Sequence, residues 1–135
     1  MKTEAKFKAR TKQVAAIELP GFVIFYVAGV GTDGIPDWSN NGYGVSSWLE
    51  FKDASPHGRF ESKENQERVC LKLSAASRCR YVVFHETTKG VKRICIIDPR
   101  QVQGKRGELS EMMIEAQCSG YDYKWLCNWI KEWHR

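Results

Sequence analysis

Apolar and polar residues follow different periods along the chain, and these periods predict where helices and strands lie. Good helix formers with a helical spacing of apolar residues occupy 3–17, 63–76 and 121–135. Runs rich in β-branched and aromatic residues, which are typical of strands, occupy 22–27, 45–52, 81–85 and 93–97. The first of these runs, FVIFYV, is apolar on both faces, so we expect it to be a central strand of a sheet.

A hairpin is predicted in the segment between residues 35 and 52. Ile35 to Ser39 can form a short strand, NNGYG at 40–44 is a turn signal, and 45–52 returns as the second strand. The polar segment 53–62 then forms a loop. Its last residue, Ser62, is placed to cap the following helix.

The chain changes character after Pro99. RQVQGKRG at 100–107 is a basic loop, and ELSEMMIEAQ at 108–117 is predicted to form a short helix. In the terminal helix Trp125, Trp129 and Trp133 recur every four residues, as a stripe on one face. Such a stripe serves a core, a subunit interface or a base-stacking platform, in that order of expectation. We expect the penultimate residue, His134, to be disordered.

The predicted order is helix, strand, hairpin, helix, strand, strand, helix. It indicates an α/β fold with a mixed central sheet flanked by helices, followed by a C-terminal helical segment. A chain of 135 residues that is 42% hydrophobic can bury one core, so we expect a single domain over 1–135. Apolar runs fall short of the roughly 20 residues that span a bilayer, and the N-terminus lacks a signal-peptide pattern, so we expect a cytoplasmic protein.

The charge indicates the kind of partner, and the cysteine pattern bears on disulfides and metal sites. The formal net charge is +5, with basic residues gathered in KFKARTK, RCR and RQVQGKR, which suits a polyanion. The five cysteines form no CxxC pair and no cluster of metal-ligand spacing. We therefore expect free thiols rather than disulfides or a zinc site.

Candidate chemistry lies in the predicted hairpin. Glu50 and Lys52 are two residues apart on a strand and so point to the same face, while Leu49 and Phe51 point to the core. If Asp37 lies on the adjacent strand, its carboxylate stands beside that of Glu50, and a cation between them relieves their repulsion. Such hard oxygen ligands favour Mg²⁺ or Mn²⁺. The alternative is an ordinary Pro-Asp turn and a solvated strand face.

This arrangement, Gly34-Ile35-Pro36-Asp37 followed by a turn and a strand ending in Glu-x-Lys, resembles the PD-(D/E)xK nuclease superfamily. It is most similar to the VRR-NUC family, whose members carry an N-terminal acidic helix, a G-[IV]-P-D element, an E-x-K strand and a helix bearing Gln. The resemblance covers about 3–98 and implies a restriction-endonuclease-like αβββαβ core. The remaining residues, about 99–135, form the C-terminal basic loop and helices.

The resemblance also implies roles for individual residues. Asp37 and Glu50 become the metal ligands and Lys52 the catalytic lysine. Gln66 is the helix polar group that faces the site, and Glu4 is the acid of the first helix. Ser62 precedes Gln66 by four positions, one more than is usual in the family.

Further residues are candidates for contact with DNA. His57 and Arg59 follow the Glu-x-Lys strand, where an arginine can make a bidentate contact with a phosphate. Lys105 and Arg106 lie between glycines in the basic loop and can follow a phosphate backbone. The alternative for both pairs is a solvated loop.

The sequence as a whole predicts a Mg²⁺- or Mn²⁺-dependent DNA endonuclease selective for branched or Holliday junction DNA. A homodimer is expected, because a two-fold dimer sets two active sites against two strands and because phage-type VRR-NUC proteins are similar to small dimeric Holliday junction resolvases. A restriction-like or nicking duplex endonuclease is one alternative. A non-catalytic DNA-binding module and a protein-binding adaptor that uses the tryptophan stripe are others.

Overall fold

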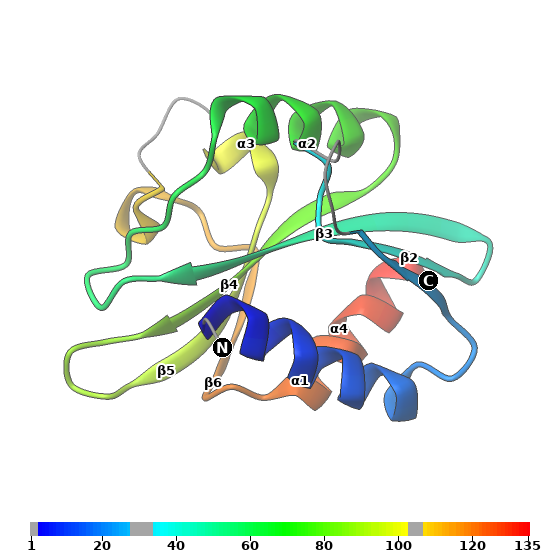
Figure 1. Ribbon diagram of the computed structural model, residues 1–135, viewed down its shortest axis with the longest axis horizontal. Helices are drawn as coiled ribbons and strands as arrows, with labels where there is room; N and C mark the ends of the chain where they lie inside the picture. The colour runs from blue at the N-terminus through cyan, green and yellow to red at the C-terminus, as the bar shows by residue number, and fades with distance from the viewer. Residues whose placement is uncertain (1–2, 28–33, 103–106) are drawn as a thin grey trace.

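The computed structural model describes residues 3–27, 34–102 and 107–135 (Figure 1). One sheet contains all six strands of this part of the chain, in the order β1-β2-β3-β4-β5-β6. The strands are β1 (Val23–Tyr26), β2 (Trp38–Gly42), β3 (Val45–Ala54), β4 (Cys79–Glu86), β5 (Lys92–Ile97) and β6 (Ala116–Ser119). The helices are α1 (Thr3–Glu18), α2 (Glu64–Ala76), α3 (Pro99–Val102) and α4 (Tyr123–His134), with one 3₁₀ turn at Leu109–Glu111.

The sheet is mixed. β3 and β4 run parallel, joined by a crossover through α2, and the other neighbouring strands are antiparallel. Figure 1 shows α1 and α4 on one face of the sheet and α2 and α3 on the other. The order from α1 to β4 is αβββαβ, which confirms the predicted fold class of a mixed sheet flanked by helices.

Each face of the sheet has its own hydrophobic core. On the side of α1 and α4, Leu49 and Phe51 of β3 pack with Phe7 of α1, whose ring stacks on Phe84 with 4.1 Å between centroids. On the side of α2, Cys70 packs with buried residues of β4 and β5. Because β3 sends Leu49 and Phe51 to the first core, Glu50 and Lys52 point toward α2, as strand alternation predicts.

The expectation that segment 22–27 is a central strand is wrong. β1 is an edge strand that pairs only with β2. Ile24 packs against the core, but Val23 and Phe25 point to the opposite side and are 57% and 61% exposed. A run that is apolar on both faces shows only that the segment is hydrophobic, not that both of its faces are buried. Here no described element covers the face that carries Val23 and Phe25.

The predicted hairpin forms, with a shifted first strand. β2 begins at Trp38, so Asp37 lies one residue before it rather than within it. The turn is limited to Tyr43 and Gly44, both with positive φ, which matches the right-handed twist of a two-residue hairpin. Ser62 does not cap α2: the N-cap residue is Lys63, and the Ser62 hydroxyl is 3.2 Å from that of Tyr81.

Two expectations about the C-terminal third are also wrong. Segment 108–117 contains one 3₁₀ turn and the start of β6 instead of a helix, so the C-terminal segment adds a strand to the sheet as well as α4. His134 is ordered and 1% exposed. Its Nδ1 lies 3.0 Å from the carbonyl oxygen of Gly42 and its Nε2 lies 2.7 Å from the Ser47 hydroxyl. The end of α4 is thereby fastened to the β2–β3 hairpin.

The tryptophan stripe of α4 packs against the core. Trp125, Trp129 and Trp133 are half-buried beside Leu126 and Ile130, and the rings of Trp129 and Trp133 stack at 4.8 Å. The structure thus supports the core interpretation of this stripe. Within the described residues, every helix is too short or too polar to cross a bilayer.

Candidate active site

A tight turn places Asp37 at the end of the sheet. Gly34 has φ +82°, and a Cβ there would lie 3.1 Å from Val69 and 3.2 Å from the backbone oxygen of Asn65, so glycine lets the turn approach α2 closely. Asp37 is then held by its neighbour in the sheet, because the Phe51 amide donates to its Oδ2 at 2.8 Å. Its own amide donates to Glu50 Oε1 at 3.2 Å.

Glu50 and Lys52 lie next to each other on the α2 face of β3. The Glu50 side chain is 3% exposed, and its Oε2 lies 3.5 Å from Lys52 Nζ. Lys52 Nζ also donates to Gln66 Oε1 on α2 at 2.6 Å. The lysine is therefore held between the strand and the helix, which limits where its ammonium group can point.

Glu4 completes a group of three carboxylates. It comes from the first turn of α1, and one carboxylate oxygen from each of Glu4, Asp37 and Glu50 lies within 4.8 Å of the others. The structure thus brings together the five residues to which the sequence assigns catalysis, from four different parts of the chain. They line a cavity of about 360 Å³, with Glu61 and Lys63 among its other residues.

Burial and mutual repulsion dominate the electrostatics of the three acids. Burial, and then the charge of Asp37, raise the pKa of Glu50 to about 9, although Lys52 opposes the shift. Burial and the charge of Asp37 also raise the pKa of Glu4. A titratable group perturbed in this way at the wall of a cavity is characteristic of functional sites.

The residues of this site fit a divalent cation. Carboxylate oxygens are the hard ligands that Mg²⁺ and Mn²⁺ prefer, and a cation between them relieves the repulsion that raises the pKa of Glu50. The ion would be held by Glu4, Asp37 and Glu50. Among the described residues, these three form the one group of His, Cys, Asp or Glu side chains close enough together to hold a metal ion. Lys52 is close enough to Glu50 to act on a group bound beside the ion.

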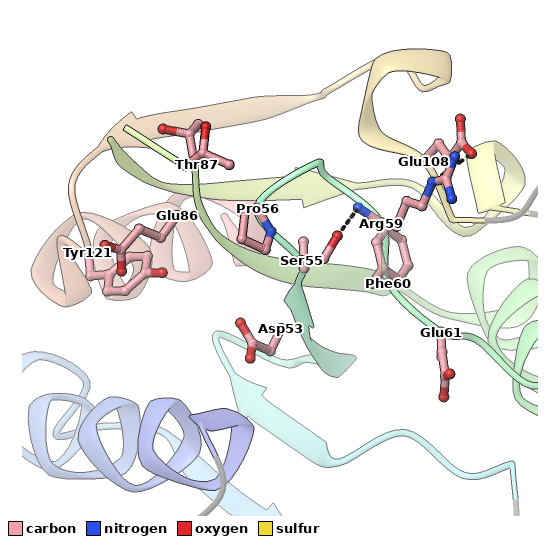
Figure 2. A pocket seen from close by; sticks show the side chains of 12 residues that line it. Asp53, Ser55, Pro56, Arg59, Phe60, Glu61, Glu86, Thr87, Glu108 and Tyr121 are labelled. Carbon is pink, nitrogen blue, oxygen red and sulfur yellow. Dashed lines mark hydrogen bonds and ion pairs between the residues drawn. The ribbon is translucent and has the colours of Figure 1, made fainter. Parts of the chain in front are cut away.

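A larger cavity of about 950 Å³ adjoins the site, and Glu61 lines both. Figure 2 shows Arg59 in it, where the amide is 3.2 Å from the Ser55 hydroxyl and the guanidinium is 3.0 Å from Glu108. The charge of Arg59 is therefore already paired. The other acids on its wall are Asp53, Glu61 and Glu86.

The four residues proposed to contact DNA are not gathered at the carboxylates. Arg59 belongs to the larger cavity, and His57 is exposed in the preceding loop. Neither lines the smaller cavity described above. Lys105 and Arg106 lie outside the described residues. Contact of these four side chains with DNA stays a prediction.

Comparisons with known proteins give a distant structural likeness. No family model matches the chain, and no curated protein matches it. The chain is similar to Hjc, a Holliday junction resolvase from the archaeal hyperthermophile Archaeoglobus fulgidus, with a TM-score of 0.48 and 13% identity over 77% of this chain and 90% of that chain. With a score below 0.5 and so few identical residues, the likeness is a distant one. Membership of the VRR-NUC family stays a prediction.

The sequence did not single out Lys8, which the structure places at the site. Its Nζ lies 3.2 Å from Asp37 Oδ1 and 3.8 Å from Glu4 Oε1. The spacing from Glu4 to Lys8 is one helical turn, which was a signal that the two side chains share a face of α1. Nothing local in the sequence shows that this face meets the Asp37 turn.

Proposed function

We propose that this protein is a metal-dependent DNA endonuclease of the PD-(D/E)xK superfamily, and within it of the VRR-NUC family. One observation carries the proposal. Oxygens of Glu4, Asp37 and Glu50 converge within 4.8 Å, and Lys52, which follows Glu50 by two residues on β3, lies 3.5 Å from it. Acids that hold a cation beside a fixed lysine are suited to hydrolysis of a phosphodiester.

Each residue of the site has a distinct task in this proposal. Glu4, Asp37 and Glu50 would hold Mg²⁺ or Mn²⁺, which would supply Lewis acidity toward the phosphodiester and lower the pKa of the attacking water. Lys52 orients that water or stabilises the negative charge that grows on phosphorus. Gln66 holds Lys52 in place through its 2.6 Å hydrogen bond, and the Phe51 amide does the same for Asp37.

DNA is the proposed substrate because the protein carries a surplus of positive charge, part of it on the helix that supplies Glu4. The net charge is +5, and Lys6, Arg10 and Lys12 are exposed on the helix that supplies Glu4. Basic side chains on one helix attract a phosphate backbone without reading its sequence. Branched or Holliday junction DNA is the preferred form in this proposal, and plain duplex is the alternative within the same chemistry.

The proposed homodimer has a candidate surface at β1. The Val27 amide bonds the Asp37 carbonyl oxygen at 2.8 Å, so in this antiparallel pair the alternate residues, Ile24 and Tyr26, direct their backbone groups away from β2. β1 carries no charged residue or proline, which usually protect an edge strand. A second copy of β1, related by a two-fold axis, pairs with this edge in antiparallel fashion and covers the exposed Phe25.

Cleavage of labelled four-way junction and matched duplex DNA tests the proposal. The reactions contain Mg²⁺, Mn²⁺ or EDTA, and compare wild type with Lys52→Ala and with Lys72→Ala, an exposed lysine of α2, as the control. We expect metal-dependent cleavage that falls by about two orders of magnitude in Lys52→Ala, the usual loss when a charge-stabilising donor is removed. Lys72→Ala should cleave like wild type.

The outcomes separate the alternatives. Tight DNA binding without cleavage in either metal overturns the proposal in favour of a non-catalytic DNA-binding module. Absence of DNA binding even at low salt favours a protein-binding adaptor. Equal cleavage of junction and duplex retains the nuclease and selects the restriction-like or nicking alternative.

A further inference from the structure

A lysine outside the predicted catalytic set contacts the carboxylates. Lys8 Nζ lies 3.2 Å from Asp37 Oδ1 and 3.8 Å from Glu4 Oε1, and the Lys8 side chain is 33% exposed. These two acids are candidate ligands of the divalent ion. In the described part of the chain, both ion pairs of Lys8 are therefore with candidate ligands of the ion.

Lys8 and Lys52 differ in how firmly they are held. The Lys52 side chain is 12% exposed, and its ammonium group lies 3.5 Å from Glu50 but also donates at 2.6 Å to Gln66, which is not a candidate ligand. Lys8 forms ion pairs with Asp37 and Glu4, and its side chain is more exposed than that of Lys52. An ion that enters the cluster can displace the Lys8 ammonium into water, whereas displacement of Lys52 would break its bond to Gln66.

The charges of the cluster explain why such a lysine is useful. Three carboxylates within 4.8 Å of one another repel, and a nearby cation lowers the cost of keeping them together. A lysine on a flexible stem supplies that charge in the metal-free protein and can still move away. A divalent ion carries twice the charge and accepts several oxygens at once, so it replaces the ammonium group.

We infer that Lys8 is an internal counter-ion of the carboxylate cluster, at Glu4 and Asp37, and that a divalent ion must displace its ammonium group from Asp37 to bind. The inference rests on the proposed function, because it assumes that the cluster is a metal site. Lys8 acts through the position and charge of Asp37 and Glu4, so it is a positioning residue. Its presence stabilises the metal-free protein and weakens the affinity for the ion.

Two measurements of opposite sign test this role. Lys8→Met keeps the length and apolar character of the stem and removes the charge. We expect it to melt at a lower temperature than wild type in EDTA, because Glu4 and Asp37 lose the ammonium group paired with them. We also expect it to bind Mn²⁺ about tenfold more tightly, a change of the size that removal of a competing charge a few ångströms away produces. Calorimetric titration or the paramagnetic resonance signal of free Mn²⁺ gives the dissociation constant.

Two further variants provide the controls. Lys6→Met removes the same charge from an exposed position on the same helix, and should leave the Mn²⁺ dissociation constant within about twofold of wild type, as expected for a solvent-screened charge. Lys8→Arg retains a competing cation and should bind Mn²⁺ no more tightly than wild type does.

The failures are distinguishable. If wild type binds Mn²⁺ and Lys8→Met binds it equally or more weakly, the counter-ion role is overturned and the proposed nuclease site remains. If wild type itself does not bind Mn²⁺, the metal site of the proposed function is overturned and the inference falls with it.

Discussion

At the scale of one residue, the raised pKa of Glu50 shows that a negative charge at this site is unfavourable without a cation. Its carboxyl group is almost fully buried beside Asp37, and burial followed by the Asp37 charge raises its pKa to about 9. In the unfolded chain the same group titrates near 4.5. Between these values the folded protein holds a proton that the unfolded chain has released. The contribution of Glu50 to stability is therefore fully present below about pH 4.5 and is lost as the pH rises toward 9.

Glu50→Gln should stabilise the metal-free protein at pH 8. Glutamine keeps an oxygen for the Asp37 amide and is neutral without taking up a proton on folding, so we expect the free energy of unfolding to rise by about 2–4 kcal/mol. The gain should shrink at pH 5. Urea denaturation in EDTA at both pH values measures it, and Glu61→Gln, an exposed acid of the same cavity, is the control. An equal increase in the free energy of unfolding at pH 5 and pH 8 would contradict the raised pKa of Glu50.

Gln66 is expected to act on rate rather than on metal binding. Its Oε1 accepts from Lys52 Nζ at 2.6 Å and is not part of the carboxylate group. Gln66→Ala should slow the proposed cleavage by about tenfold to a hundredfold, as expected when an orienting hydrogen bond to the proposed catalytic lysine is lost. The Mn²⁺ dissociation constant should not change. Gln13→Ala, at an exposed glutamine of α1, is the matched control, and weaker Mn²⁺ binding by Gln66→Ala would contradict this division.

At the scale of elements, β3 organises both the site and the C-terminus. It supplies Glu50 and Lys52 toward α2, and near its start Ser47 contacts His134 on the opposite face. The contacts of His134 are consistent with one tautomer, in which Nδ1 donates to the Gly42 carbonyl oxygen and Nε2 accepts from Ser47. These contacts hold α4 against the hairpin, and burial of the ring disfavours the charged imidazolium there.

The free energy of unfolding should depend on pH because of the buried contacts of His134 with Gly42 and Ser47. Burial is the main cause that lowers the pKa of His134 below 6.5, so its contribution to stability is fully present above pH 6.5 and is lost as the pH falls through the folded pKa. His134→Gln should unfold more easily at pH 8, by about 1–3 kcal/mol for the lost buried hydrogen bonds. The difference in unfolding free energy from wild type should narrow below pH 6.5.

Urea denaturation of both proteins across this pH range measures the difference. His57→Gln, at an exposed histidine, is the control and should follow the wild-type curve. A constant difference between wild type and His134→Gln at all pH values would mean that His134 does not titrate differently in the folded and unfolded states.

At the scale of the whole molecule, the sheet determines which surfaces meet. It brings the first turn of α1, the Asp37 turn and the middle of β3 to one place, with α2 above them (Figure 1). It also leaves β1 at one edge, close to the site, since the Val27 amide bonds the Asp37 carbonyl oxygen. A partner paired on β1 would therefore lie near Asp37, and the proposed dimer would carry two candidate sites.

Phe25→Asp should convert the proposed dimer into a monomer. An aspartate at this 61% exposed position introduces a charge that a paired strand would bury at considerable cost. Light scattering should give the mass of two chains for wild type and of one chain for the variant. Val91→Asp, which changes an exposed apolar residue at a different site, should remain dimeric. A wild-type protein that is monomeric at all concentrations would exclude the proposed assembly.

Several features of this protein follow from local sequence. The helical and strand periods of 3–17, 45–52 and 63–76 predict α1, β3 and α2, because burial of one face imposes its period on the residues. The two-residue period of a strand also places Glu50 and Lys52 on one face, and the G-I-P-D and E-x-K elements identify the candidate acids and lysine. These properties depend on neighbours in the chain, which a sequence displays directly.

Only the tertiary structure decided the rest, because each remaining feature depends on a partner distant in sequence. β1 is apolar yet lies at an edge, and β6 is four residues long with a signal too weak to compete with a predicted helix. His134 is ordered by Gly42 and Ser47, more than eighty positions away. Lys8 meets Asp37 because the sheet carries the Asp37 turn to the face of α1. The sequence alone identified the candidate residues, whereas the approach of their carboxylate oxygens to within 4.8 Å was decided by the packing of α1, α2 and the sheet.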